Sequence, residues 1–418
     1  MKNSKTKIAF FINSLGGGGA EKIMTTLLDN LDSEKYDISL LLTYENVINY
    51  GVCSRIKIQS YDFESIQVKW VVVVIIKLLA MIRCIPYIFN PIIIFIKYKN
   101  ISTDLLKLYS RYALAKHYLD KNKPDVVVSF LFHSSLIAIL CKLFSGSKFK
   151  VICSDHCTLS KELVNFFPLT YKILPRLAFK RIDGYVAVSA GVARDLFNNF
   201  RLPMNKISVI YNGVDIDSIF KSASMPVEAT VERLFLDDRF TIVNVGRLAP
   251  PKNQRCLLDA FCKVREQLPC RLILIGQGEL YDELKCQAAM LGIEKDVYFL
   301  GWQTNPYNIM KKCDLFVLSS SWEAFPNVLI EAMAVGLPIV STDCPTGPSE
   351  ALSNGKYGDL VPVEDSDVLA SAIIKMHNDK SRRQKFAILG RERAFDFGLL
   401  HMISAYEKLI DEVAVESR

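Results

Sequence analysis

The sequence predicts an α/β protein made of two doubly wound units, each with a parallel sheet covered by helices. First, continuous β-branched runs alternate with segments of helical spacing, which is typical of parallel strands buried on both faces. Second, this alternation weakens over residues 212–228, which contain several Ser, Asp and Pro residues, and then starts again. Third, 418 residues are too many for one compact core, so two domains are expected.

The first unit is expected to begin with a strand, followed by a helix over 20–31 whose isoleucine and leucines share one face. A further helix is expected over 188–200, with Ser189 as its N-cap, because a serine oxygen can accept from the first free N–H groups. The expected strands of this unit are 7–12, 37–44, 125–132, 149–155, 183–189 and 207–213.

The second unit repeats the pattern, and Gly292 is expected to close one of its helices. A last helix over 399–413 ends the chain. Ligands in such sheets bind beyond the carboxyl ends of the strands, so the cleft between the two units is the expected active site. The expected strands are 240–248, 270–278, 296–302, 314–320 and 338–343, and the helices between them are 253–268, 279–292, 305–313 and one that begins near 326.

Composition excludes several classes of protein. Half of the residues are hydrophobic and 23% are charged, which is typical of a globular chain. The eleven cysteines are scattered without a Cys-x-x-Cys pair, which indicates reduced thiols. Cys153, His156 and Cys157 lie close together, but no second ligand pair follows with zinc-like spacing, so no metal site is expected. The apolar run 8–12 is too short for a secretory signal, so the protein is expected to stay in the cytoplasm.

The net charge of +7 is concentrated in the N-terminal half, where one segment over 66–99 mixes aliphatic, aromatic and basic residues. From 68 onward this segment has no acidic residue, and its longest uncharged run, 84–96, is thirteen residues, against the roughly 20 that span a bilayer. This pattern favours contact with the surface of an anionic membrane. A buried helical pair under the first sheet and a spanning hairpin are the alternatives.

A glycine loop, "SLGGGGAEK" at 14–22, separates the first strand from the first helix, where a phosphate-binding turn belongs. It is not a dinucleotide fingerprint, because the last position of Gly-x-Gly-x-x-Gly read from Gly16 is Glu21. It is not a P-loop either, since no Gly-Lys-Ser/Thr follows. The alternative is a permissive tight turn.

Two carboxylates frame the start of the helix in "SWEAFPNVLIEA", residues 321–332. Pro326 suits the first helical position, Glu331 lies about one turn in, and Glu323 lies in the preceding loop. The helix N-terminus attracts negative or hydroxyl oxygens, while each carboxylate accepts hydrogen bonds from a diol. Arg247 and Lys252 follow the first strand of the second unit, where two cations can hold a diphosphate. Together these residues fit a sugar nucleotide.

These motifs, with "LILIGQGE" at 272–279, resemble the retaining glycosyltransferases of family four over essentially the whole chain. The resemblance implies a GT-B fold, in which two Rossmann-like domains face a central cleft and a C-terminal helix returns to the N-terminal domain. It implies an acceptor-binding domain over 1–213, a nucleotide-sugar-binding domain over 214–395 and the returning helix over 396–418. "STDCPTGPSEAL", at 341–352, further resembles members that add N-acetylhexosamines or galactose-type sugars to glycans linked to polyprenyl diphosphate.

The resemblance also implies roles for single residues. Arg247 and Lys252 would neutralise the departing diphosphate, Glu331 would bind the ribose hydroxyls, and Glu323 would bind the transferred sugar. His156 matches a family histidine near the reacting centre, and His133 is its competitor. The remaining donor-binding positions are Gly17 and Gly18 beside the phosphate and acceptor, Gly276 and Gly278 on the nucleobase side, and the backbone of Ala324, Phe325, Pro326, Asn327 and Val328.

The implied partners are a nucleotide-sugar donor, with uridine as the expected base, and an acceptor that is either a glycan linked to polyprenyl diphosphate or another glycan. The implied setting is bacterial polysaccharide or glycan biosynthesis, with the protein held peripherally at the inner face of the cell membrane through 66–99. No cofactor, metal ion or nucleic acid is expected. The alternatives are a non-hydrolysing UDP-sugar 2-epimerase of the same architecture and a non-enzymatic membrane-associated scaffold.

Overall fold

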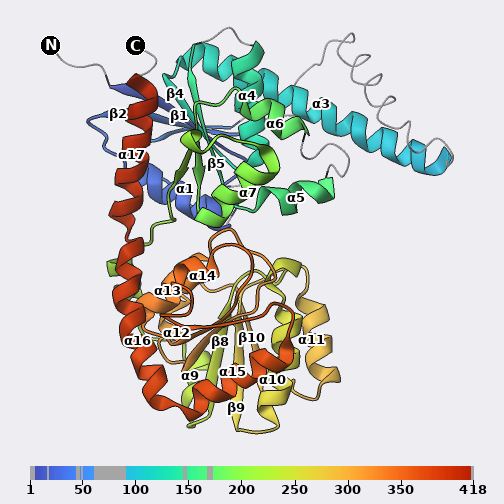
Figure 1. Cartoon of the computed structure of the whole chain (residues 1–418), viewed down its shortest axis with the longest axis vertical. Coiled ribbons are helices and arrows are strands. Elements are labelled where there is room, and N and C mark those ends of the chain that lie inside the picture. Colours follow the sequence, from blue (N-terminus) through green and yellow to red (C-terminus); the bar gives the residue numbers. More distant parts are fainter. Residues whose placement is uncertain are drawn as a thin grey trace.

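The chain folds into two α/β lobes, seen one above the other in Figure 1, with both termini at the N-terminal lobe. This computed structural model describes residues 5–16, 18–43, 48, 50–60, 91–144, 148–166 and 173–415, with the backbone alone at 91–105, 164–166 and 173–174. Each lobe contains one sheet, and every strand pair in the described part of the chain is parallel. The prediction of two doubly wound α/β units is therefore confirmed.

The N-terminal lobe is built on a seven-stranded sheet of order β3-β2-β1-β4-β5-β6-β7. Ile8, Phe10 and Ile12 of β1 pack on one face of this sheet, while Ala9 and Phe11 pack on the other. The elements are β1 Thr6–Ile12, α1 Gly19–Asn30, β2 Tyr36–Leu42, β3 Lys57–Gln59, α3 Pro91–Asn122, β4 Val126–Phe130, α4 Phe132–Phe144, β5 Lys150–Asp155, α5 Leu159–Phe166, α6 Ile173–Phe179, β6 Gly184–Ala187, α7 Ala190–Phe200 and β7 Ile207–Val209.

The C-terminal lobe is built on a six-stranded sheet of order β10-β9-β8-β11-β12-β13. Its strands are almost wholly apolar because helices cover both faces. The elements are α8 Ile216–Ala223, α9 Ala229–Glu232, β8 Phe240–Val245, α10 Gln254–Arg265, β9 Cys270–Ile275, α11 Tyr281–Met290, β10 Val297–Gly301, α12 Tyr307–Met310, β11 Leu315–Leu318, α13 Asn327–Val335, β12 Ile339–Thr342, α14 Pro348–Ala351, β13 Asp359–Val361, α15 Ser366–Asn378, α16 Lys380–Ala394 and α17 Leu399–Val415.

The last two helices run along one side of both lobes, with α17 on the N-terminal lobe (Figure 1). Tyr406 and Ile410 of α17 are buried in the core beneath the first sheet. The Tyr36 hydroxyl donates to Asp411 at 2.9 Å, and Lys35 forms an ion pair with the same carboxylate. The prediction that the C-terminal helix returns to the N-terminal domain is confirmed.

Two chain segments pass between the lobes, and they pair with each other. The Val214 N–H donates to Phe397 O at 2.9 Å, and the Leu399 N–H donates to Val214 O at 3.0 Å. The two segments thus form a short parallel bridge, centred on Val214 and Gly398, beside the interface between the lobes.

Both sheets reverse their strand order at one point, between β1 and β4 in the first and between β8 and β11 in the second. Loops that leave the carboxyl ends of neighbouring strands at such a point diverge to opposite faces of the sheet and leave room for a ligand. The glycine loop follows β1, and Lys252 and Glu323 follow β8 and β11. The topology therefore directs these motifs to the interface between the lobes.

Several local predictions are confirmed. Ser189 is the N-cap of α7 and accepts from the Val192 N–H, and Gly292 follows α11 with a φ of +67°. One prediction was incomplete, because the segment 212–228 contains helix α8. Asp215 caps this helix by accepting from the Ser218 N–H, and its isoleucines pack inward at helical spacing.

The predicted membrane-facing segment lies largely outside the described residues, because 61–90 are not described. Residues 91–99 belong to the first turns of α3, which begins at Pro91. No helix within the described ranges is both long enough and apolar enough to cross a membrane.

Candidate active site

Lys252 and Glu323 meet at the point where the second sheet reverses its strand order. The Lys252 ammonium lies 2.5 Å from Glu323 Oε1, and Ser320 Oγ donates to the same oxygen at 2.7 Å. Both side chains are largely covered, with 24% of Lys252 and 10% of Glu323 exposed. The structure thus brings together one predicted phosphate cation and the predicted sugar-binding carboxylate.

Glu331 lies on α13 and contacts a lysine of the other lobe and a tyrosine of its own lobe. Its Oε1 accepts from the Lys22 ammonium at 2.7 Å and from the Tyr307 hydroxyl at 3.1 Å, and Lys22 also donates to Tyr307 at 2.9 Å. Burial alone would lower the pKa of Lys22, but the Glu331 charge and Tyr307 raise it above its ordinary value. Burial and the same carboxylate raise the pKa of Tyr307 to about 12. Lys22 is therefore charged and Tyr307 neutral at physiological pH.

Two helix N-termini converge here from opposite lobes. A Cβ added to Gly19, the first residue of α1, would lie 3.9 Å from the side-chain nitrogen of Asn327, the first residue of α13. The side-chain oxygen of Asn327 is also fixed in place, because it accepts a hydrogen bond from Asn212 at 2.9 Å. Each helix N-terminus carries about half a positive charge and N–H groups without a partner in the helix. The region between them therefore favours an anion, and at α1 the Glu21 carboxylate, which is hydrogen-bonded to the Gly18 backbone, already supplies one.

The loop that precedes α13 is anchored by hydroxyls of the N-terminal lobe. Thr158 donates to Glu323 O at 2.9 Å, and Ser189 donates to Ala324 O at 2.8 Å. In a trans peptide the C=O and N–H groups point in opposite directions, so the N–H groups of Ala324 and Phe325 point away from those hydroxyls. Pro326 has no N–H, so within this predicted donor-binding stretch only its neighbours can donate backbone hydrogen bonds.

Arg247 lies apart from the Lys252–Glu323 pair. Its side chain is 71% exposed, and its guanidinium is 3.0 Å from Glu279. The glycines that follow β9 lie where the chain passes close to the backbone of the Arg247 loop. A Cβ on Gly276 would lie 2.0 Å from Gly246 O, and one on Gly278 would lie 2.2 Å from Leu248 O. These two glycines therefore allow the two loops to pack together. Their place on the nucleobase side stays a prediction.

His156 follows β5 and is held against aromatic rings. Its ring stacks on Phe130 with centroids 4.8 Å apart, and Nε2 lies 3.3 Å from Ser154 Oγ. Burial lowers the pKa of His156 to about 3, so the imidazole is neutral at physiological pH. Burial also lowers the pKa of His133, at the start of α4.

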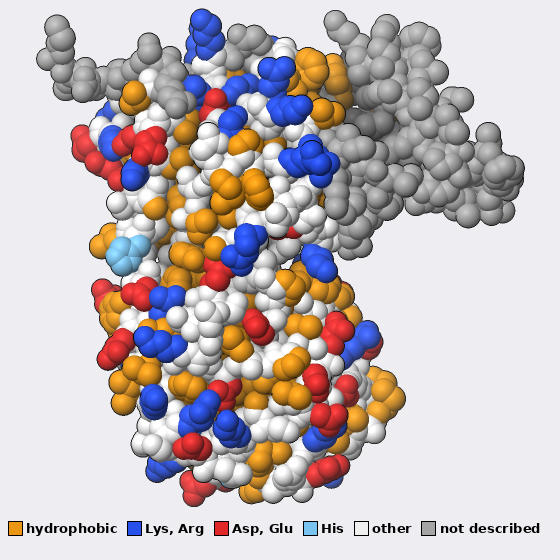
Figure 2. All heavy atoms as spheres, in the orientation of Figure 1, with side chains coloured by type: hydrophobic (Ala, Val, Ile, Leu, Met, Phe, Trp, Pro, Cys, Tyr) orange, Lys and Arg blue, Asp and Glu red, His pale blue; other side chains and the backbone are white. Residues whose placement is uncertain are grey.

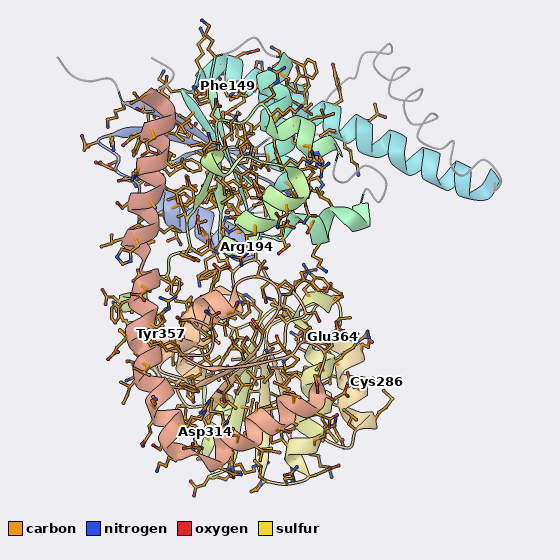
Figure 3. All side chains as sticks on the ribbon, viewed as in Figure 1. Phe149, Arg194, Cys286, Asp314, Tyr357 and Glu364 are labelled. Atoms are coloured by element: carbon orange, nitrogen blue, oxygen red, sulfur yellow. The ribbon has the colours of Figure 1, made fainter. Side chains whose placement is uncertain are left out.

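A second carboxylate joins the two lobes. Glu350 on α14 accepts from the N–H groups of Ala190 and Gly191 at 2.8 and 2.7 Å, and from the Tyr211 hydroxyl at 3.1 Å. It thereby binds the N-terminus of α7, which is favourable for a negative charge. Figure 3 shows Arg194, also on α7, at the edge of the upper lobe that faces the lower one.

On the face shown in Figure 2, the outline narrows between the lobes, and basic and acidic side chains lie beside one another there. A pocket of about 420 Å³ lies in the C-terminal lobe, but its lining includes none of the four predicted charged residues. Its walls are Pro250, Asn253, Arg255, Cys256, Asp259, Leu280, Ser321, Trp322, Glu364 and Ser366. Among the residues that the structure describes, no group of three or more His, Cys, Asp or Glu side chains could hold a metal ion.

No role was predicted from the sequence for Lys22, Tyr307, Thr158 or Glu350. Lys22 belongs to the glycine motif itself, and a lysine directly after a phosphate-binding turn was a usable signal. Tyr307 and Thr158 carried no local signal, because their contacts join separate parts of the chain; Thr158, for example, is 165 residues from Glu323. Glu350 lies in the motif at 341–352, but nothing in that motif predicted its contact with the N-terminus of α7. Gly17 lies outside the described residues, while Gly18 is the N-cap of α1.

Two facing α/β lobes with charged loops at their sheet switch points define a glycosyltransferase of the GT-B architecture. The family described as Glycosyltransferase Family 4 matches residues 17–218, and the family described as Glycosyl transferases group 1 matches residues 228–393. The chain belongs to family 4 of the glycosyltransferases, a retaining family that uses nucleotide sugars. The prediction of a glycosyltransferase is thereby confirmed over the epimerase and scaffold alternatives.

Individual relatives agree with this assignment. The chain is 29% identical over 393 residues to N-acetylgalactosamine-N,N'-diacetylbacillosaminyl-diphospho-undecaprenol 4-alpha-N-acetylgalactosaminyltransferase of Campylobacter jejuni, covering 94% of this chain and 95% of the relative. It is 34% identical over 326 residues to an uncharacterised glycosyltransferase of Methanocaldococcus jannaschii, covering 69% and 80%. HepE of Anabaena, solved in complex with UDP, superposes with a TM-score of 0.72 at 20% identity, covering 97% and 100%. The GT-B fold is thereby confirmed.

Proposed function

We propose that the enzyme transfers a hexose or N-acetylhexosamine from a UDP-sugar to a glycan linked to polyprenyl diphosphate, with retention at the anomeric carbon. The observation that carries this proposal is the meeting, between two helix N-termini, of Lys252 with Glu323 and of Lys22 with Glu331. A sugar nucleotide has a diphosphate for the helix ends and cations and two sets of hydroxyls for the carboxylates.

The proposed roles follow the placement of each group. Lys252 neutralises charge on the departing diphosphate. Arg247 leaves Glu279 and binds the same diphosphate. Glu331 binds the ribose hydroxyls, and Glu323 binds the hydroxyls of the transferred sugar. The amides of Asn327 and Val328, at the start of α13, bind phosphate or sugar oxygens. The leaving phosphate accepts the proton of the acceptor hydroxyl on the same face of the sugar, so no protein nucleophile is needed.

The proposed role of His156 is to border the reacting centre as a neutral group. Its placement at the carboxyl end of β5, two residues before Thr158, brings it near the loop that carries Glu323. A neutral imidazole can exchange hydrogen bonds with sugar hydroxyls without attracting the phosphate charge away from Lys252.

The acceptor class is supported by the Campylobacter jejuni relative, whose name describes transfer to a diphospho-undecaprenol-linked sugar. The basic and aliphatic composition of 66–99 fits an enzyme that meets such an acceptor at the inner membrane surface. Sedimentation with vesicles tests this part. Binding to vesicles with anionic lipid and none to neutral vesicles is expected, and equal binding to both would contradict it.

The test of the whole proposal is a transfer assay. The enzyme is incubated with UDP-glucose, UDP-galactose, UDP-GlcNAc or UDP-GalNAc and an undecaprenyl-diphosphate-linked oligosaccharide, and the products are identified by mass spectrometry. One donor is expected to give an acceptor heavier by one sugar, with the α configuration seen by NMR. Lack of transfer from all four donors, in a folded protein that also binds none of them, would contradict the proposal.

A further inference from the structure

Lys22 reaches out of the N-terminal lobe to a carboxylate of the other lobe. It lies in the first turns of α1, directly after the glycine loop, and its ammonium donates to both Glu331 and Tyr307. The ammonium also lies 5.6 Å from the centre of the Tyr307 ring. Because Tyr307 donates to the same Glu331 oxygen, the three groups form a closed triangle.

One corner of this triangle is Glu331, the carboxylate that is proposed to bind the ribose hydroxyls. A vicinal diol binds a carboxylate through both of its oxygens, and Glu331 Oε1 already accepts two hydrogen bonds. Ribose binding must therefore displace one of the present donors. The Tyr307 ring is partly buried and packs against the hydrophobic core, whereas Lys22 has a flexible four-carbon side chain, so Lys22 is the group that moves.

The Lys22 side chain is 44% exposed, whereas Glu331 is only 11% exposed. The ammonium can therefore leave the carboxylate at modest cost and pair with another anion that binds within its reach. Lys22 lies one turn from Gly18, at the helix end that faces Asn327 of the other lobe. That is where two positive helix ends converge and where the diphosphate is proposed to bind. The new partner within reach of the Lys22 stem is then a phosphate oxygen.

We propose that Lys22 is a third cation for the donor diphosphate, and that ribose binding at Glu331 transfers it from that carboxylate to the phosphate. This inference rests on the proposed function. Its consequence is that Lys22 weakens the binding of the nucleoside alone and strengthens the binding of the nucleoside diphosphate. For the nucleoside alone, Lys22 is a competitor at Glu331; for the nucleoside diphosphate, it is also a ligand.

The test compares uridine with UDP as ligands of the full-length protein. Equilibrium dialysis with radiolabelled ligands gives Kd for the wild type, for Lys22→Met and for Lys22→Gln. In both variants the Kd of uridine is expected to fall by about threefold or more, because the competitor is gone. The Kd of UDP is expected to rise by about tenfold, because a charge-assisted hydrogen bond to phosphate is lost. Lys22→Arg is expected to keep UDP binding within about threefold of the wild type.

Lys116→Met is the matched control, because Lys116 forms an exposed ion pair with Asp120 in the same lobe. It is expected to change neither Kd. Thermal melting of each variant checks folding. The inference is overturned if uridine and UDP shift in the same direction, or if neither shifts by more than about twofold. A folded wild type that binds neither UDP nor any UDP-sugar would instead contradict the proposed function itself.

Discussion

Lys252 and Glu323 form an ion pair between the two loops that leave the second sheet at its switch point, with Nζ 2.5 Å from Oε1. They are 71 residues apart in sequence, yet β8 and β11 are neighbours in the sheet. The reversal of strand order sends these two loops over opposite faces of the sheet. The charged side chains meet beyond the carboxyl ends of the two strands, where the loops diverge. A cation and a carboxylate are thus held side by side at the place where the sugar diphosphate is proposed to bind.

Replacing a phosphate cation is expected to slow turnover without unfolding the protein. Lys252→Ala and Arg247→Ala should each lower kcat by about 10²–10³-fold, since each removes a group that stabilises charge on the leaving diphosphate. Arg247 is exposed, so its loss should leave the melting temperature unchanged. Steady-state kinetics with saturating donor measures the effect. Lys263→Ala, which breaks an exposed ion pair on α10, is the control, and near-normal turnover in Arg247→Ala would refute the assigned role.

Glu350 is expected to hold the two lobes together. Glu350→Ala removes the carboxylate that accepts from the Ala190 and Gly191 N–H groups, and a hydrogen bond to a charged group is worth about 1.5–3 kcal/mol. The lobes should therefore separate more readily, and the radius of gyration from X-ray scattering should increase. Glu232→Ala, which breaks an exposed pair with Lys312, should leave the scattering unchanged. Identical scattering curves for wild type and Glu350→Ala would contradict this role.

The two glycines after β9 are expected to be essential for packing. Gly278→Ala would place a Cβ 2.2 Å from Leu248 O, so the loops must move apart, which we expect to cost about 1–3 kcal/mol of unfolding free energy. Gly246→Ala is the matched control in the same region, because its Cβ would only touch the Lys252 side chain at 3.7 Å. Urea unfolding of the two variants makes the comparison, and equal midpoints would contradict the prediction.

Asp155 is expected to make the stability depend on pH. Burial raises the pKa of this carboxyl to about 7, even though a hydrogen bond from Tyr185 opposes the shift. Between about pH 4 and pH 7 the folded protein holds a proton that the unfolded chain has lost, so the free energy of unfolding falls as pH rises. Asp155→Asn mimics the protonated form and accepts from Tyr185 as before.

The Asp155→Asn variant should therefore gain roughly 2–4 kcal/mol over the wild type at pH 8 and little at pH 4.5. Thermal melts at the two pH values measure the difference. His156 should not contribute to any such effect at pH 8, because its imidazole is neutral there in both the folded and the unfolded chain. A gain of the same size at both pH values would show that Asp155 ionises normally in the folded protein.

Much of the fold was predictable because strands and helices are encoded locally. The β-branched runs became β1, β4 and β8, and the segment before Glu331 became the N-terminus of α13. Helix α8 was missed because its eight residues are too few for the periodicity to stand out among Ser and Asp residues. The pairing of Arg247 with Glu279 was also missed, since it depends on how closely two glycine-containing loops approach.

The sequence by itself determined the two α/β units, the helix that presents Glu331, and a family assignment that rests on ordered motifs along nearly the whole chain. Only the tertiary structure decided which residues meet between the lobes. Lys22 and Glu331 are 309 residues apart, and their contact depends on how two separately folded sheets dock. Residue spacing reports the period of one helix or strand, whereas a contact across an interface depends on the packing of every element that lies between.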